Sequence, residues 1–127
     1  MMSTKGSNRR SPPILVVDDD LRTREAIRLT LEEEGFEVET ASDGRQALHQ
    51  ARRRRPSLVV LDMRLPVADG AAVAGGLRAM LGEPPPILLI TADDRGESKA
   101  RRIGAYAFLP KPFDLEDLLA LIRLGLQ

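Results

Sequence analysis

Three runs of four apolar residues, each followed by a polar residue, constrain the fold of this chain more than any other feature. The runs read ILVV, LVVL and ILLI, and they are followed by Asp, Asp and Thr. A strand that is hydrophobic at every position must be covered on both faces, as strands in the middle of a parallel sheet are. The runs therefore predict three central strands at Ile14–Asp18, Leu58–Asp62 and Ile87–Thr91.

Two further strands are predicted at Phe36–Thr40 and Ala105–Leu109. The first alternates apolar and polar residues, which is typical of a strand with one exposed side, so we expect it at an edge of the sheet. Between the strands lie stretches with helical spacing of apolar residues that end at Gly or before Pro. These predict five helices: Leu21–Glu34, Asp43–Arg54, Asp69–Leu81, Asp94–Arg102 and Asp114–Leu126.

The last two helices differ in strength. Asp94–Arg102 contains Gly96 and few apolar anchors, which makes it the weakest, whereas Asp114–Leu126 has a strong apolar stripe that begins at Leu115. Strands that alternate with helices specify a doubly wound α/β domain with a five-stranded parallel sheet, since parallel strands need helical crossovers.

Composition narrows the class of protein. The 127 residues suit one domain, and the absence of Cys excludes disulfides and thiolate metal sites. Lys plus Arg is 19 and Asp plus Glu is 19, so no global charge favours nucleic acid or a membrane. The polar and basic residues 1–11 are predicted to be a disordered tail, and residues 12–127 the folded domain.

Polar residues that follow the predicted strands mark the candidate site. In doubly wound folds, ligands bind at the carboxyl ends of the strands, where this chain has Asp18-Asp19-Asp20, Asp62, Thr91 and Lys111. Carboxylates from two strand ends repel one another unless a cation lies among them, and oxygen ligands without His or Cys indicate Mg²⁺. An ammonium and a hydroxyl beside them could hold a phosphoryl group. Each residue alone has a structural explanation, such as helix capping, but together they predict phosphoryl transfer onto a carboxylate.

From about residue 13 to residue 126 the chain resembles the receiver domain of bacterial two-component response regulators, of the chemotaxis-Y-like kind. The motifs that carry the resemblance are ILVVDDD at the first strand, LVVLDMRLP followed by DG at the third, ITA at the fourth, and GA with FLPKPF at the fifth. The resemblance implies a flavodoxin-like strand order 2-1-3-4-5 with five helices.

The resemblance also assigns roles at the acidic site. Asp62 would accept a phosphoryl group from a histidine kinase or a phosphotransfer protein. Asp19, Asp62 and the Arg64 carbonyl would bind Mg²⁺, and Asp18 would orient metal-bound water. Lys111 would be the counter-ion of the phosphoryl group. Such a domain is not an enzyme with a separate substrate, because it catalyses only its own phosphorylation and dephosphorylation.

Signal output is a further implication. Thr91 and Phe108 would be the switch pair, and the fourth helix, fifth strand and fifth helix the output surface. Leu121 and Leu124 lie outside the main apolar stripe of the fifth helix, where they would either form an exposed patch near Tyr106, a candidate surface aromatic, or cover loops of the same chain. A homodimer through this surface is one expected use of it. The resemblance also predicts a cis peptide bond before Pro112.

Two competing interpretations fit parts of the sequence. In a haloacid-dehalogenase-like phosphatase, Asp18 would be the nucleophile, Asp20 the acid, Thr91 the phosphate ligand and Asp93-Asp94 the metal ligands. That family normally has its Lys before the final acidic pair, however, and Asp62 would have no role. A phosphate-independent interaction module is the other alternative. Such a module would be expected to have lost Asp62, Thr91 or Lys111, and all three are present.

A run of four Arg and the only His of the chain are predicted to have no functional role. The run Arg52–Arg55 lies at a helix end, where cations favour the dipole, and without aromatic neighbours it predicts a solvated face rather than nucleic-acid binding. His49, the only His, is predicted on a helix flank far from the strand ends. We expect a cytoplasmic protein with no membrane contact, since no apolar run approaches the ~20 residues of a spanning helix.

Overall fold

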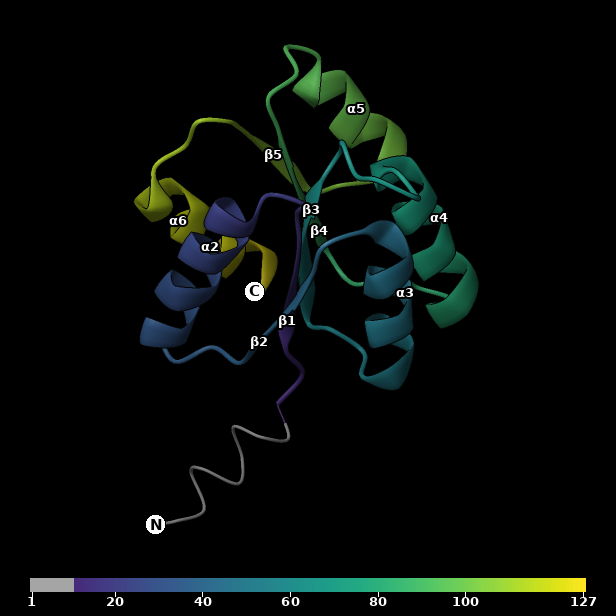
Figure 1. The fold of residues 1–127 in the computed structure, drawn as a ribbon, viewed down its shortest axis with the longest axis horizontal. Coiled ribbons are helices and arrows are strands. Elements are labelled where there is room, and N and C mark those ends of the chain that lie inside the picture. Colours follow the sequence, from purple (N-terminus) through teal and green to yellow (C-terminus); the bar gives the residue numbers. More distant parts are fainter. Residues whose placement is uncertain (1–10) are drawn as a thin grey trace.

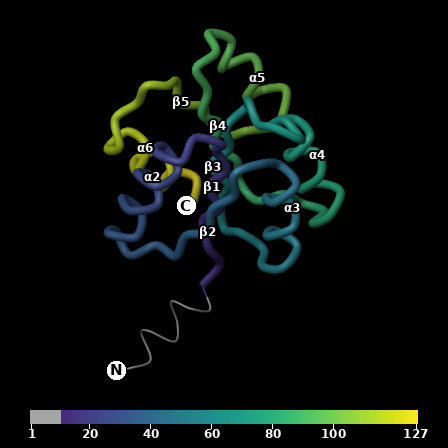
Figure 2. Tube along the Cα trace, in the orientation of Figure 1, coloured from purple at the N-terminus to yellow at the C-terminus, as the bar shows by residue number. Residues whose placement is uncertain are grey.

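In the computed structural model, which describes residues 11–127, five parallel strands form one sheet in the order β2-β1-β3-β4-β5. Helices α2 and α6 cover one face, and α3, α4 and α5 cover the other (Figures 1 and 2). The predicted fold class and strand order are confirmed. The strands are β1 (Ile14–Val17), β2 (Val38–Ala41), β3 (Leu58–Asp62), β4 (Ile87–Thr91) and β5 (Ala107–Pro110). The helices are α2 (Leu21–Glu33), α3 (Gly44–Arg53), α4 (Gly70–Leu81), α5 (Gly96–Ile103) and α6 (Leu115–Gly125).

The three all-apolar strands form the centre of the sheet. Every residue of β1, β3 and β4 is buried, because alternate side chains enter two separate cores. One core lies under α3, α4 and α5, and the other under α2 and α6. The register pairs Val17 with Leu61 and Asp62 with Ile90, so the carboxyl ends of these strands lie side by side.

Two strands, β2 and β5, each begin two residues later than the sequence predicts. The Phe36 N–H donates to Leu31 O at 3.1 Å, so the backbone at this residue is bonded to the last turn of α2 rather than to the sheet. Gly104 ends α5 in a left-handed conformation, and the Ala105 N–H bonds back to Ala100 O at 2.9 Å. In both places a helix C-terminus takes residues that the sequence pattern assigns to the strand.

The apolar stripe of α6 is shorter than predicted. Leu118 and Ile122 are fully buried, but Leu115 is 38% exposed. Leu115 instead borders a groove between α2 and the segment after β5, which also includes Ala26, Lys111 and Pro112. The first residue of the helix therefore faces the carboxyl edge of the sheet and not the core.

The N-terminal tail predicted for residues 1–11 lies, apart from Ser11, outside the described residues. Within residues 11–127, no helix combines the length and the apolar character needed to cross a bilayer.

Candidate functional site

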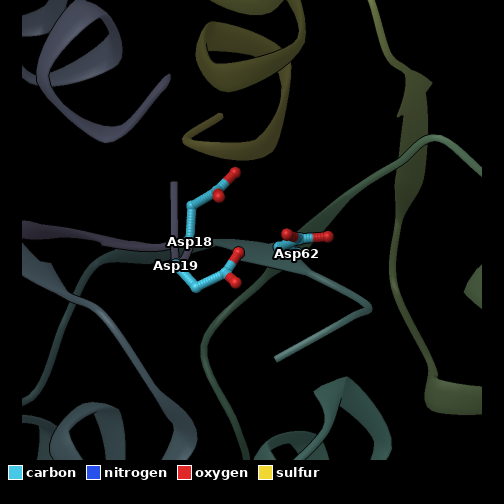
Figure 3. A group of neighbouring side chains, drawn as sticks. All are labelled: Asp18, Asp19 and Asp62. Carbon is cyan, nitrogen blue, oxygen red and sulfur yellow. The ribbon is translucent and has the colours of Figure 1, made fainter. Parts of the chain in front are cut away.

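Three carboxylates meet at the carboxyl edge of the sheet. Asp18 and Asp19 follow β1, and Asp62 is the last residue of the neighbouring β3 (Figure 3). One oxygen from each lies within 4.8 Å of the others. Asp18 and Asp62 are buried while Asp19 is exposed, so the cluster opens to solvent on one side only.

Lys111 brings a positive charge into the cluster. Its Nζ lies 2.9 Å from Asp18 Oδ2 and 3.3 Å from Asp62 Oδ2. Its backbone N–H donates to Thr91 O at 2.8 Å, which fixes the residue to the end of β4. Burial would lower the pKa of this amine, but the hydrogen bond to Asp18 and the two negative charges raise it overall. Lys111 is therefore a permanent cation at the site.

The surroundings of Asp62 disfavour the charged form of its carboxyl group. Burial raises the pKa of its carboxyl group, the negative charge of Asp18 adds to the effect, and Lys111 opposes it. Three carboxylates against one ammonium leave the site short of positive charge. The residues present therefore fit a divalent cation with a preference for oxygen ligands, such as Mg²⁺.

The loop after β3 is held close to Asp62. The Arg64 N–H donates to Asp62 Oδ1 at 3.2 Å, and the Gly70 N–H donates to Met63 O at 3.0 Å. A Cβ on Gly70 would lie 3.2 Å from Asp62 O and 3.0 Å from Met63 Cα, so only glycine lets the start of α4 approach the end of β3 this closely. Arg64 lines a shallow depression together with Asp19.

Thr91 and Phe108, the predicted switch pair, lie near one another. Thr91 is buried, and its Oγ1 accepts the Asp93 N–H at 3.0 Å, so the hydroxyl is bound to its own loop. Phe108 on the neighbouring strand is half-buried, and both side chains border Gly96 at the start of α5. The bond between Lys111 and Pro112 is cis, as predicted.

Lys99 is a residue near the site that sequence reasoning missed. Its ammonium forms an ion pair with Asp93, and the side chain lines the same depression as Asp19 and Arg64. The hydrogen bond from Lys99, with one from the Arg95 N–H, lowers the pKa of Asp93 to about 2. The signal in the sequence is only a Lys six positions after an Asp, across a helix start, and this spacing is too common to be informative.

The phosphatase interpretation needs Asp20 and Asp93 free, and neither is. The Asp20 carboxylate caps α2 by accepting from Thr23 N at 3.0 Å and from Thr23 Oγ1 at 2.5 Å. Asp93 is bound to Lys99. Within residues 11–127, the one acidic group with the spacing of a metal site is that of Asp18, Asp19 and Asp62.

The predicted output surface is more closely packed than expected. Tyr106 is not a surface aromatic: it is half-buried, and its hydroxyl donates to Leu121 O at 2.7 Å. Leu121 is partly buried against the core under α2 and α6, whereas Leu124 is 54% exposed. Of the two leucines, only Leu124 is therefore available for a partner patch.

Comparison with known proteins agrees with this geometry. Residues 14–123 match the family model of the response regulator receiver domain. The chain is 46% identical over 112 residues to the response regulator MprA of Mycobacterium leprae and to that of Mycolicibacterium vanbaalenii, and these matches cover 87% of this chain. They cover 49% and 48% of the two relatives, so the chain spans about half the length of the curated relatives it matches.

Solved structures give the same result. The chemotaxis protein CheY4 of Vibrio cholerae superimposes with a TM-score of 0.81 at 34% identity, covering 90% of this chain and 98% of that one. The receiver domain of NtrX from Brucella abortus superimposes with a TM-score of 0.82 at 35% identity, covering 89% and 97%. The family match gives no support to the phosphatase alternative. The chain belongs to the response regulator receiver domains, the phosphoacceptor domains of two-component signalling.

Proposed function

We propose that Asp62 is the phosphoacceptor of this receiver domain, and that a histidine kinase or a phosphotransfer protein is its phosphodonor. The observation that carries the proposal is the position of Asp62: a carboxylate at a strand end, 3.3 Å from the Lys111 ammonium and within 4.8 Å of two further carboxylates. No other acidic residue of the described chain combines a buried strand end, a bound ammonium and two carboxylate neighbours from an adjacent strand.

This geometry supports the following transfer step. A carboxylate oxygen of Asp62 attacks the phosphorus of the donor, and the bond from phosphorus to the donor's imidazole nitrogen breaks with its electron pair left on that nitrogen. Lys111 neutralises charge on the phosphoryl oxygens, and the Thr91 hydroxyl donates a hydrogen bond to one of them. For hydrolysis, water attacks the phosphorus and the Asp62 carboxylate leaves, so inorganic phosphate is released and the domain returns to its starting state.

A divalent cation completes the site. Asp19, Asp62 and the Arg64 carbonyl are the proposed ligands, and Asp18 is proposed to orient metal-bound water. Mg²⁺ would neutralise the carboxylate cluster and the incoming phosphoryl group, which otherwise repel each other. The exposed side of the cluster at Asp19 is where the cation and its waters have access.

Phosphorylation is proposed to shift the domain between two states. Thr91 exchanges its bond from the Asp93 N–H for one with the phosphoryl group, Phe108 turns inward, and the surface of α5, β5 and α6 changes shape.

Leu124 is exposed on that surface and favours an apolar contact there. The partner that we propose is a second copy of the domain, which would form a homodimer. Light scattering with and without beryllofluoride, an aspartyl-phosphate mimic, tests this proposal, and equal masses would contradict it.

We place the domain in the cytoplasm, where ATP-dependent histidine kinases phosphorylate such acceptors.

The experiment that tests the phosphoacceptor uses acetyl phosphate, which needs no partner protein. Intact-mass spectrometry of the wild type should show the gain of one phosphoryl group with Mg²⁺ and none with EDTA. Asp62→Asn should take up no phosphoryl group. Asp43→Asn is the matched control, because Asp43 caps α3 and Asn preserves such a cap. Undiminished labelling of Asp62→Asn, or labelling in EDTA, would contradict the proposal.

A further inference from the structure

Gly96 is buried at the start of α5, where its lack of a side chain has no conformational explanation. Glycine in a helix costs conformational entropy, and the sequence marks this residue as a weakness of α5. The left-handed glycines of the described chain are Gly35, Gly82 and Gly104, and Gly96 is not among them. The reason for a glycine here must therefore be space rather than backbone freedom.

The space is occupied by the proposed switch pair. A Cβ on Gly96 would lie 2.8 Å from Phe108 Cδ2, 3.1 Å from Phe108 Cε2 and 3.1 Å from Thr91 Cγ2. The first distance is shorter than real Cβ contacts, and the other two are tight. Close approaches are common at the helical glycines, since Gly44, Gly70, Gly76 and Gly125 also leave too little room for a Cβ, whereas Gly75 in α4 has no neighbouring atom within 4 Å. At Gly96 the atoms in the way belong to the proposed switch pair.

We infer that Gly96 is a positioning residue that provides the space which the Phe108 ring and the Thr91 methyl group both border. This inference rests on the proposed function, because Thr91 and Phe108 are the pair through which phosphorylation of Asp62 is read out. The ring has α5 and Thr91 on its inner side, and on its outer side it borders a groove between α5 and β5. The volume at Gly96 decides between these two sides.

The space at Gly96 also links the two switch residues, because both side chains border it. When Thr91 moves toward the phosphoryl group, its methyl group leaves the space beside Gly96, and the Phe108 ring moves into that space. A methyl group at position 96 would fill part of it and push the ring toward the outer groove. Gly96→Ala should therefore separate phosphorylation, which it leaves intact, from the inward turn of Phe108, which it blocks.

The test uses ring resonances of the three phenylalanines in ¹³C-labelled protein, with Phe108 assigned from Phe108→Leu. In the wild type, Mg²⁺ with beryllofluoride should shift the Phe108 resonances. Gly96→Ala should take up beryllofluoride, seen as bound ¹⁹F, but lose that shift. Gly75→Ala, the matched control, should behave as the wild type. A full Phe108 shift in loaded Gly96→Ala would overturn the inference, whereas a wild type that takes up no beryllofluoride contradicts the proposed function instead.

A second variant covers the case in which Gly96→Ala does not fold. If the ring causes the clash, Phe108→Ala should restore folding of Gly96→Ala, and the urea midpoint of the double variant should lie close to that of Phe108→Ala alone. Effects of the two substitutions that simply add would show that the space at Gly96 does not serve Phe108.

Discussion

Lys111 Nζ lies 2.9 Å from Asp18 Oδ2 and 3.3 Å from Asp62 Oδ2, so the ammonium is closer to Asp18 than to the proposed phosphoacceptor. Both carboxylates are buried and share this one cation. A phosphoryl group on Asp62 would attract the ammonium, and Asp18 would then need another positive partner. The proposed metal site beside Asp18 supplies one, so the two ligand sites are expected to depend on each other.

Replacing Lys111 by Met should lower the free energy of unfolding at pH 7 by about 2 kcal/mol, because two buried carboxylates lose their counter-charge. The side chain is 23% exposed, which keeps the effect below that of a fully buried pair. Urea unfolding in EDTA measures it, with Lys111→Arg as the control that keeps the charge. Mg²⁺ should recover part of the loss. Equal stability of Lys111→Met and the wild type would show that Lys111 is only a surface charge.

Replacing Asp62 by Asn should stabilise the domain at pH 7 in the absence of divalent cations. The pKa of Asp62 is raised above its ordinary value of 3.8, mainly by burial, so between the two values the folded state binds more protons than the unfolded state. Wild-type stability therefore falls as the pH rises through this window. The advantage of Asp62→Asn should shrink as the pH falls toward 4, as urea midpoints across this range would report. A constant or reversed difference would contradict the raised pKa.

The fold was predictable from the sequence because burial on both faces leaves a simple pattern: uninterrupted apolar runs that end in Asp18, Asp62 and Thr91. The strand ends could be located from these runs alone. The helix termini that take Phe36 and Ala105 could not, because they depend on hydrogen bonds back to the preceding helix.

The candidate site was predictable to the same extent. Residues at strand ends follow from topology, but the ion pair of Lys99 with Asp93 and the packing of Tyr106 on α6 depend on how helices are placed over the sheet. Gly96 shows the limit most clearly. The sequence marks it as a poor helix residue, and only the position of Phe108 gives the reason.

Val67, in the loop between β3 and α4, should be a site of stabilising substitution. Its φ of 72° lies in a γ-turn closed by the hydrogen bond from Ala68 N–H to Pro66 O at 2.8 Å, which is unfavourable for a β-branched residue, and Val67 is 74% exposed. Val67→Asn should raise the free energy of unfolding by about 1 kcal/mol, since Asn tolerates this conformation and no packing is lost. Val67→Thr keeps the branching and should leave stability unchanged. Urea unfolding that ranks Val67→Asn at or below Val67→Thr would contradict the strain.

Tyr106 offers a spectroscopic measure of how β5 docks on α6. It is the only Tyr in a chain without Trp, and burial raises the pKa of its phenol to about 12 from an ordinary value of 10. Because the unfolded state releases this proton first, stability should fall as the pH rises from 10 to 12. Ultraviolet titration of phenolate formation, with circular dichroism to follow folding, measures both. Ionisation near pH 10 in the folded domain would place Tyr106 in solvent.

The most direct measurement of the central claim is the location of the phosphoryl group itself. Wild-type protein is treated with acetyl phosphate and Mg²⁺, the acyl phosphate is reduced with borohydride to the corresponding alcohol, and the modified residue is identified by peptide mass spectrometry. The geometry of β1, β3 and Lys111 predicts a single modified residue, Asp62. Modification of Asp18 in place of Asp62 would contradict this account.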